Sequence, residues 1–145
     1  MIYYLDSSAL VKRYIREDGT DKMNSVIAGA QILVTSKLTY AEILSAFFKK
    51  YRAKELSEKI LLNVLEKFET DWAYFLVIEF GDELLPLIKK LIQKHYFRGA
   101  DSVHLSSALW LKDAVKTDIT FVASDLNLLE AANSETLQIL NPAEK

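Results

Sequence analysis

The chain has 145 residues and a formal net charge of −2; 50% of its residues are hydrophobic, 26% are charged, and it has no cysteine. This composition predicts one globular domain over residues 1–145, and it excludes a disordered chain, a disulfide framework and a thiolate metal site. The small negative charge excludes a general nucleic-acid coat protein but not a nuclease. No apolar run approaches the ~20 residues of a membrane span and no basic region precedes the first one, so we expect no membrane association and a cytoplasmic protein.

The first half of the chain begins with a short apolar run and continues with segments of helical periodicity. Asp6 ends the first run, Thr20 is positioned to cap a helix, and Gly29 is positioned to end it. We expect strands over 2–5 and 31–35 and helices over 7–14, 21–28, 36–52 and 55–72. The last two helices follow each other directly, which predicts a helical hairpin over about 36–72 that projects from the sheet.

The second half repeats the alternation of strand and helix. Gly81 ends an apolar run, and Arg98-Gly99 interrupts the helical pattern. We expect strands over 74–80, 118–122 and 137–140 and helices over 82–96, 100–116 and 125–133. Strands that alternate with helices imply a parallel sheet covered on both faces by right-handed crossovers. The fold class is therefore α/β, with a five-stranded parallel sheet in a three-layer α/β/α domain.

Four acids lie near the starts of predicted helices, at Asp6, Glu42, Asp101 and Asp125. Each has a purely structural interpretation: an aspartate there is a favourable cap or dipole partner, and the segment 39–42 fits a capping box closed by Glu42. Asp6 and Asp125, however, directly follow buried strands. The carboxyl ends of parallel strands share one edge of the sheet, where ligands bind in open α/β folds. We therefore expect these acids to converge.

Clustered carboxylates predict a metal site. They repel one another, and a divalent cation relieves that repulsion. Ligand sets made only of oxygen suit Mg²⁺, for which Mn²⁺ can substitute. The four glycines do not form a phosphate-binding loop, and no serine lies in a nucleophile elbow. A metal-dependent reaction at the acids is the chemistry that remains.

The sequence resembles a known family in four segments: YLDSSALVKRY, LTYAEILSAF, RGADSVHLSSAL and FVASDLNLLEAA. They are similar to the acidic motifs of PIN-domain ribonucleases, in the right order and over nearly the whole chain. The nearest group is the VapC-type toxins of toxin–antitoxin pairs. The resemblance implies that Asp6, Glu42, Asp101 and Asp125 bind metal. One departure is Ala123, where family members often have Ser or Thr; Ser124 and Ser8 are the hydroxyls that remain nearby.

The resemblance also implies a function and partners. It implies a Mg²⁺-dependent endoribonuclease that hydrolyses RNA phosphodiester bonds, forms a homodimer and is held inactive by a VapB-like antitoxin. An arginine of that antitoxin is the expected ligand of the acids. The alternatives are a non-toxin RNA-processing nuclease and an inactive PIN-fold binding module. A receiver-type phospho-switch is excluded because the third strand ends in Glu79 rather than an aspartate, and Ser8 excludes a two-aspartate phosphatase motif.

Basic residues near the acids are candidates for RNA-phosphate contacts, because a nuclease of negative charge needs local basic surface. The candidates are Lys12, Arg13, Arg16 and Arg98. A solvated helix face is the structural interpretation of the run from 12 to 16. His104, three residues after Asp101, is more consistent with a packing or hydrogen-bonding role than with metal ligation, since hard ions prefer oxygen.

Overall fold

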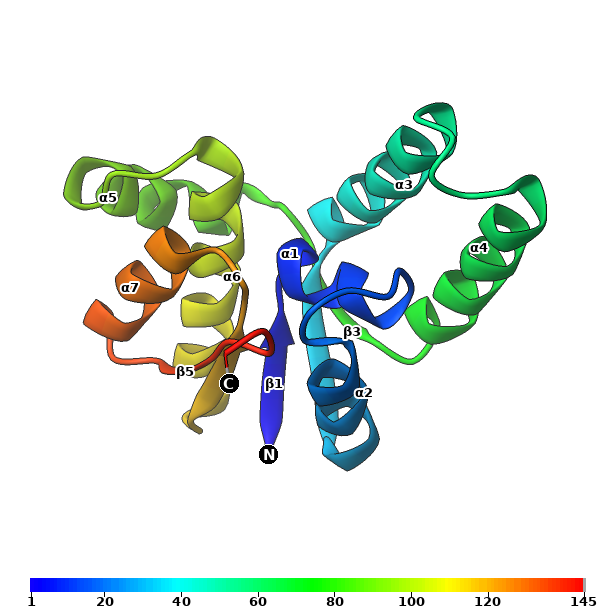
Figure 1. The fold of residues 1–145 in the computed structure, drawn as a ribbon. Coiled ribbons are helices and arrows are strands. Elements are labelled where there is room, and N and C mark those ends of the chain that lie inside the picture. Colours follow the sequence, from blue (N-terminus) through cyan, green and yellow to red (C-terminus); the bar gives the residue numbers. More distant parts are fainter. Residues whose placement is uncertain (145) are drawn as a thin grey trace.

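A five-stranded parallel sheet organises the computed structural model, which describes residues 1–144 (Figure 1). Its strands are β1 (Ile2–Leu5), β2 (Ile32–Ser36), β3 (Leu76–Ile78), β4 (Ile119–Val122) and β5 (Gln138–Leu140), in the order β3-β2-β1-β4-β5. Tyr4 is in register with Val34 of β2 and with Phe121 of β4. The predicted parallel sheet is confirmed, and the first strand of the chain lies at its centre.

The central strand is buried on both faces, which explains why its sequence is apolar throughout. Successive side chains point to opposite faces of a strand. Tyr4 accordingly belongs to one hydrophobic cluster and Leu5 to the other, and both are fully buried. The same two-residue period places Asp6, just after the strand, on the face of Tyr4.

One face of the sheet is covered by three helices from the second half of the chain (Figure 1). These are α5 (Leu85–Lys94), α6 (Gly99–Val115) and α7 (Leu126–Ser134). Leu105 of α6 and Leu128 of α7 are fully buried in this layer. Beneath them the rings of Tyr4 and Phe121 stack with their centroids 5.2 Å apart. The N-terminal half of α6 is enclosed by protein even at polar positions such as Ser106.

The other face is covered by helices from the first half, which completes the three-layer α/β/α arrangement. These are α1 (Ser7–Leu10), α2 (Thr20–Gly29), α3 (Lys37–Arg52) and α4 (Glu58–Trp72). The helices α3 and α4 lie side by side as the predicted hairpin (Figure 1). Phe47 and Phe68 meet edge to face at 6.0 Å, and Tyr14 packs against both. Much of the aromatic surface of the hairpin is therefore core.

Several local predictions were wrong in detail. The capping box over 39–42 does not form: Ser36 caps α3 through the Leu38 N–H, and Thr39 is buried with its hydroxyl 2.7 Å from that of Thr35. The residue at the N-cap of α2 is Gly19, and not Thr20 as the sequence predicted. Its φ of 98° is in the left-handed region, which only glycine adopts readily. The helix expected over 82–96 is a 3₁₀ turn at Asp82–Leu84 followed by α5.

Within residues 1–144, no helix is both long enough and apolar enough to cross a membrane.

Candidate functional site

The loops that follow β1 and β4 are joined at the carboxyl edge of the sheet. The Asp6 N–H donates to the carbonyl of Val122 at 3.1 Å. The Ser124 N–H donates to Ser8 Oγ at 3.0 Å, and the Ser8 hydroxyl donates in turn to Asp6 Oδ1 at 2.8 Å. Strand order reverses between these two strands, which is where ligands bind in open α/β sheets.

Asp6 is a buried carboxylate, and only 3% of the residue is exposed. Its Oδ1 also accepts the Ala9 N–H at 3.1 Å, so the residue caps α1 as the structural interpretation predicts. Burial raises the pKa of Asp6 to about 6; His104 and the bonds from Ser8 and Ala9 oppose this, and the charge of Glu42 adds to it. Asp6 is therefore an acid whose negative charge is poorly compensated by the protein.

Glu42 is positioned by a hydrogen-bonded chain from the interior. Its Oε1 lies 2.6 Å from Nε2 of His104, which is 1% exposed. The other ring nitrogen, Nδ1, lies 2.9 Å from the hydroxyl of the fully buried Tyr4. Burial raises the pKa of Tyr4 well above its ordinary value, so the phenol stays protonated. These three side chains come from α3, α6 and β1.

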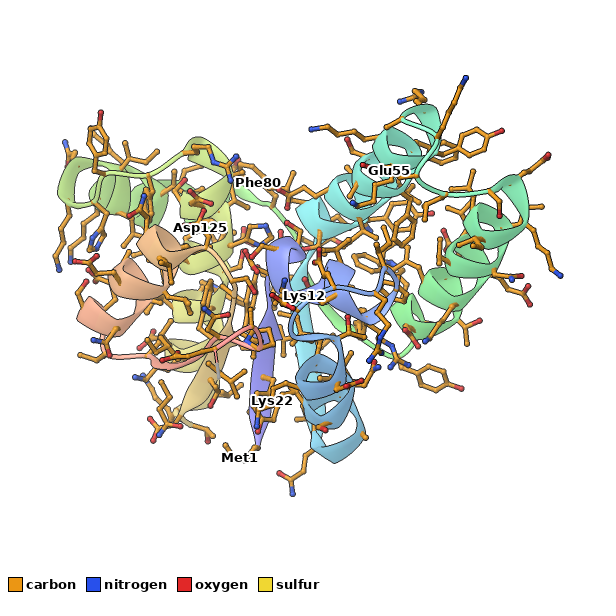
Figure 2. The ribbon with its side chains drawn as sticks, viewed as in Figure 1. Met1, Lys12, Lys22, Glu55, Phe80 and Asp125 are labelled. Carbon is orange, nitrogen blue, oxygen red and sulfur yellow. The ribbon has the colours of Figure 1, made fainter. Side chains whose placement is uncertain are left out.

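Asp101 and Asp125 are held by the backbone at the starts of α6 and α7. Asp101 Oδ2 accepts the Arg98 N–H, and Asp125 Oδ1 accepts the Leu128 N–H, both at 3.1 Å. The two acids and Arg98 share a cavity of about 560 Å³. Asp125 lies where α7 begins, at the upper end of that helix in the view (Figure 2).

The structure thus brings the predicted acids to one edge of the sheet as two pairs. Asp6 and Glu42 are close enough for the charge of Glu42 to raise the pKa of Asp6, while Asp101 and Asp125 line the cavity. Among residues 1–144, however, no three His, Asp or Glu side chains are grouped closely enough to hold a metal ion as they stand. Each acid instead accepts a hydrogen bond from its own partner in the protein.

The donor set at this edge nevertheless fits a hard divalent cation. The acids present oxygen, which Mg²⁺ and Mn²⁺ prefer. Beside Asp125, Ser124 Oγ is buried and has no hydrogen-bond partner within residues 1–144. A buried hydroxyl without a partner is costly, and a ligand or a bound water supplies what it lacks.

The basic candidates differ sharply in where they lie. Lys12 is 8% exposed and pairs with Glu17 at 3.2 Å, and Figure 2 shows it near the middle of the view. Arg13 binds Asp71 through two of its nitrogens, at 2.6 and 3.3 Å. The interpretation of this run as a solvated face is therefore wrong at both positions.

The other two basic candidates are exposed. The Arg16 side chain is 75% exposed and pairs with Asp21. The Arg98 side chain is 79% exposed, with Nε 3.7 Å from Asp101 Oδ2. Of the basic candidates, Arg98 is the one that lines the acidic cavity.

Sequence reasoning missed Tyr4, which it covered only as part of the strand predicted over 2–5, and did not connect His104 to Glu42. Two signals were present. Tyr4 precedes Asp6 by two positions and so shares its face of the strand. His104 follows Asp101 by three positions on one helix, which places the two on neighbouring faces. The link to Glu42, 62 residues away, has no local signature.

Comparisons with known proteins agree with this fold. The family model described as "PIN domain" matches residues 3–134. Ribonuclease VapC45 of Mycobacterium tuberculosis is 31% identical over 112 residues, which cover 77% of this chain and 78% of the relative.

Two solved structures share the fold. The structure of FitAcB from Neisseria gonorrhoeae has a TM-score of 0.73 at 15% identity and covers 100% of both chains. A toxin–antitoxin complex from Klebsiella pneumoniae has a TM-score of 0.70 at 12% identity and covers 99% of both. The match of the family model over most of the chain and the VapC relative together establish that the chain belongs to the PIN-domain family and, within it, to the VapC-type ribonucleases.

Proposed function

We propose that the protein is a divalent-metal-dependent endoribonuclease and the toxin of a toxin–antitoxin pair, with Asp6, Glu42, Asp101 and Asp125 as its metal-binding acids. The observation that carries the proposal is the meeting of the loops after β1 and β4, which places Asp6 and Asp125 on either side of the strand-order reversal. Membership of the VapC-type ribonucleases supplies the reaction class.

Mg²⁺ is the proposed ion, with Mn²⁺ able to replace it. When bound, such an ion polarises the scissile phosphate and lowers the pKa of an attacking water. The protein itself supplies oxygen ligands held at fixed positions. Ser8 fixes Asp6, His104 fixes Glu42, and the Arg98 N–H fixes Asp101.

The proposed substrate is RNA with unpaired bases. The related protein from M. tuberculosis is named a ribonuclease. Proteins select RNA over DNA through unstacked bases and 2′-hydroxyl groups, which a duplex DNA does not offer. In the cavity beside Asp101 and Asp125, Arg98 is the exposed cation that binds an RNA phosphate.

The proposed partners are a VapB-like antitoxin and a second copy of the chain. The solved neighbour from K. pneumoniae is a toxin–antitoxin complex. An arginine from such a partner, inserted among the acids, would form charge-assisted hydrogen bonds and compete with the metal. On the helical hairpin Tyr51 is 38%, Ile60 48% and Leu62 58% exposed, which leaves apolar surface for a homodimer.

The experiment compares two aspartates on the same helix. Asp101 is buried at the start of α6, whereas the Asp113 side chain near the end of α6 is 86% exposed. We expect the wild type and Asp113→Asn to cleave single-stranded RNA in Mg²⁺ or Mn²⁺, and we expect Asp101→Asn and EDTA-treated protein to show no cleavage. Matched DNA should remain intact. Full cleavage by Asp101→Asn, or in EDTA, contradicts the proposal.

The same two variants test the proposed toxicity when expressed in a bacterial host. Wild type and Asp113→Asn should arrest growth, and Asp101→Asn should not. Co-expression of the partner gene should restore growth, and the purified protein should have the molar mass of a dimer. RNA cleavage without growth arrest would instead identify an RNA-processing nuclease.

A further inference from the structure

Tyr4, His104 and Glu42 form a continuous chain of side chains from the centre of the sheet to its carboxyl edge. Tyr4 lies on the central strand, His104 on α6 and Glu42 on α3, so the chain connects the helix layers on opposite faces of the sheet. Its two hydrogen bonds measure 2.9 Å and 2.6 Å. Tyr4 and His104 are 0% and 1% exposed, while the Glu42 side chain is 28% exposed. The chain therefore runs from a dry interior to a partly solvated carboxylate.

The order of donors along this chain follows from what each group offers. A carboxylate only accepts hydrogen bonds, so the contact between His104 and Glu42 requires a proton on Nε2. In the neutral imidazole Nδ1 is then an acceptor. The hydroxyl of Tyr4 lies at Nδ1, and in this tautomer it is the donor. Tyr4 thus selects the tautomer of His104 that donates to Glu42.

Aromatic packing, in addition to the hydrogen bonds, fixes the imidazole ring of His104. The ring of Tyr4 meets that of His104 edge to face, with centroids 6.0 Å apart, and it also stacks on the ring of Phe121. Buried hydrogen bonds in a protein interior are strong when every member is satisfied. The position of Glu42 Oε1 is therefore set by the core rather than by solvent.

We propose that His104 is a positioning residue: held by Tyr4, it binds Oε1 of Glu42 and leaves Oε2 for the catalytic metal. This inference rests on the function proposed above and assigns His104 no contact with metal or RNA. Among the hydrogen bonds within residues 1–144, Glu42 uses Oε1 alone. Ligating carboxylates in metal sites are themselves held by hydrogen bonds of this kind, and losing such a bond costs ~10–100-fold in metal affinity or activity.

The test uses paired substitutions at His104. Leucine fills a similar volume but donates no hydrogen bond, whereas the amide nitrogen of glutamine reaches about as far as Nε2 and does donate. We expect His104→Leu to bind Mn²⁺ ~10–100-fold more weakly by calorimetry, with kcat reduced and KM for RNA unchanged. His104→Gln should recover most of the affinity. The Mn²⁺ affinity of Tyr4→Phe should lie between those of the two His104 variants, because without the tyrosine hydroxyl the His104 ring can adopt either tautomer.

The matched control is a second buried tyrosine, away from the acids. The Tyr14 hydroxyl, in a residue only 8% exposed, donates to Asp71 Oδ2 at 2.7 Å. Tyr14→Phe should change thermal stability but leave Mn²⁺ affinity at the wild-type value. Nitrogen NMR of the metal-free protein should show a proton on Nε2 of His104, and Tyr4→Phe should lower the fraction of molecules that carry it.

The outcomes separate this inference from the function on which it rests. Wild-type Mn²⁺ affinity in His104→Leu, equal losses in the leucine and glutamine variants, or a proton on Nδ1 in place of Nε2 would each overturn the inference. Asp101→Asn would still lose metal in those cases, and the proposed function would stand. A wild-type protein that neither binds Mn²⁺ nor cleaves RNA overturns both.

Discussion

Asp6 and Glu42 accept hydrogen bonds from side chains, Asp6 in addition from the Ala9 N–H, whereas Asp101 and Asp125 accept hydrogen bonds from backbone N–H groups at the starts of their own helices. Ser8 binds Asp6 and His104 binds Glu42. The other two acids accept N–H groups from within three residues. The first pair is tied to distant segments, through His104 and through Ser8, which accepts the Ser124 N–H; the second pair is held by local capping alone. Substitutions in the two pairs should consequently act in different ways.

The largest effect on stability is expected at Asp6. In the metal-free protein its pKa is raised from 3.8 to about 6, a difference worth about 3 kcal/mol. The folded state therefore holds the Asp6 proton more tightly than the unfolded chain. This contribution to stability is complete below pH 3.8 and is lost as the pH rises through about 6. Ionised Asp6 destabilises the metal-free fold at neutral pH.

Asp6→Asn removes that charge, and its amide oxygen still accepts the hydrogen bonds from the Ser8 hydroxyl and the Ala9 N–H. Denaturant unfolding in EDTA should show the variant more stable than wild type by up to about 3 kcal/mol at pH 8, with the difference vanishing near pH 4. Asp113→Asn, at an exposed aspartate, should show no such trend. A less stable Asp6→Asn protein at pH 8 would mean that burial does not penalise this charge.

A smaller effect of opposite sign is expected at Asp125. This residue caps α7 through the Leu128 N–H, so Asp125→Ala should lower the free energy of unfolding by about 1 kcal/mol. Asp125→Asn retains the cap and should match wild type. Urea titrations of the three proteins at pH 7 in EDTA measure this. Equal stability of Asp125→Ala and Asp125→Asn would mean that the cap at Asp125 does not stabilise α7.

The smallest effect is expected at Arg98, whose side chain is 79% exposed. Arg98→Ala should leave the unfolding free energy within about 0.5 kcal/mol of wild type. It should raise KM for RNA several-fold and reduce the slope of log affinity against log salt by about 0.7, the value for one phosphate contact on a single strand. Lys116→Ala, at the far end of α6, is the control. If Arg98→Ala leaves the slope of log affinity against log salt unchanged, Arg98 does not contact an RNA phosphate.

The sequence predicted what depends on near neighbours. Asp6 and Asp125 were placed correctly because each follows an apolar strand, and parallel strands end at one edge. The parallel sheet followed from the alternation of strands and helices. Glu42 was assigned a capping box because its spacing from Thr39 fits one, yet Ser36, one turn earlier, competes better for the helix start.

The remainder could not be read from local pattern. The bond between Glu42 and His104 joins residues 62 positions apart, and only the packing of α3 and α6 around the sheet brings them together. Lys12 looked like a surface residue because its neighbours are charged, but α1 is a single turn followed by a 3₁₀ turn, and this path carries Lys12 inward. Such contacts follow from tertiary structure rather than from propensity.

The central position of β1 has a consequence for synthesis on the ribosome. This strand is made before the other four, yet it pairs with β4, which is made only after β2 and β3. Pairings between distant segments form slowly and late. A nascent chain that stops before residue 119 has Asp6 and Glu42 but lacks the strand that joins Asp6 to Asp125. We therefore expect no nuclease activity from a nascent chain until β4 has been made and has paired with β1.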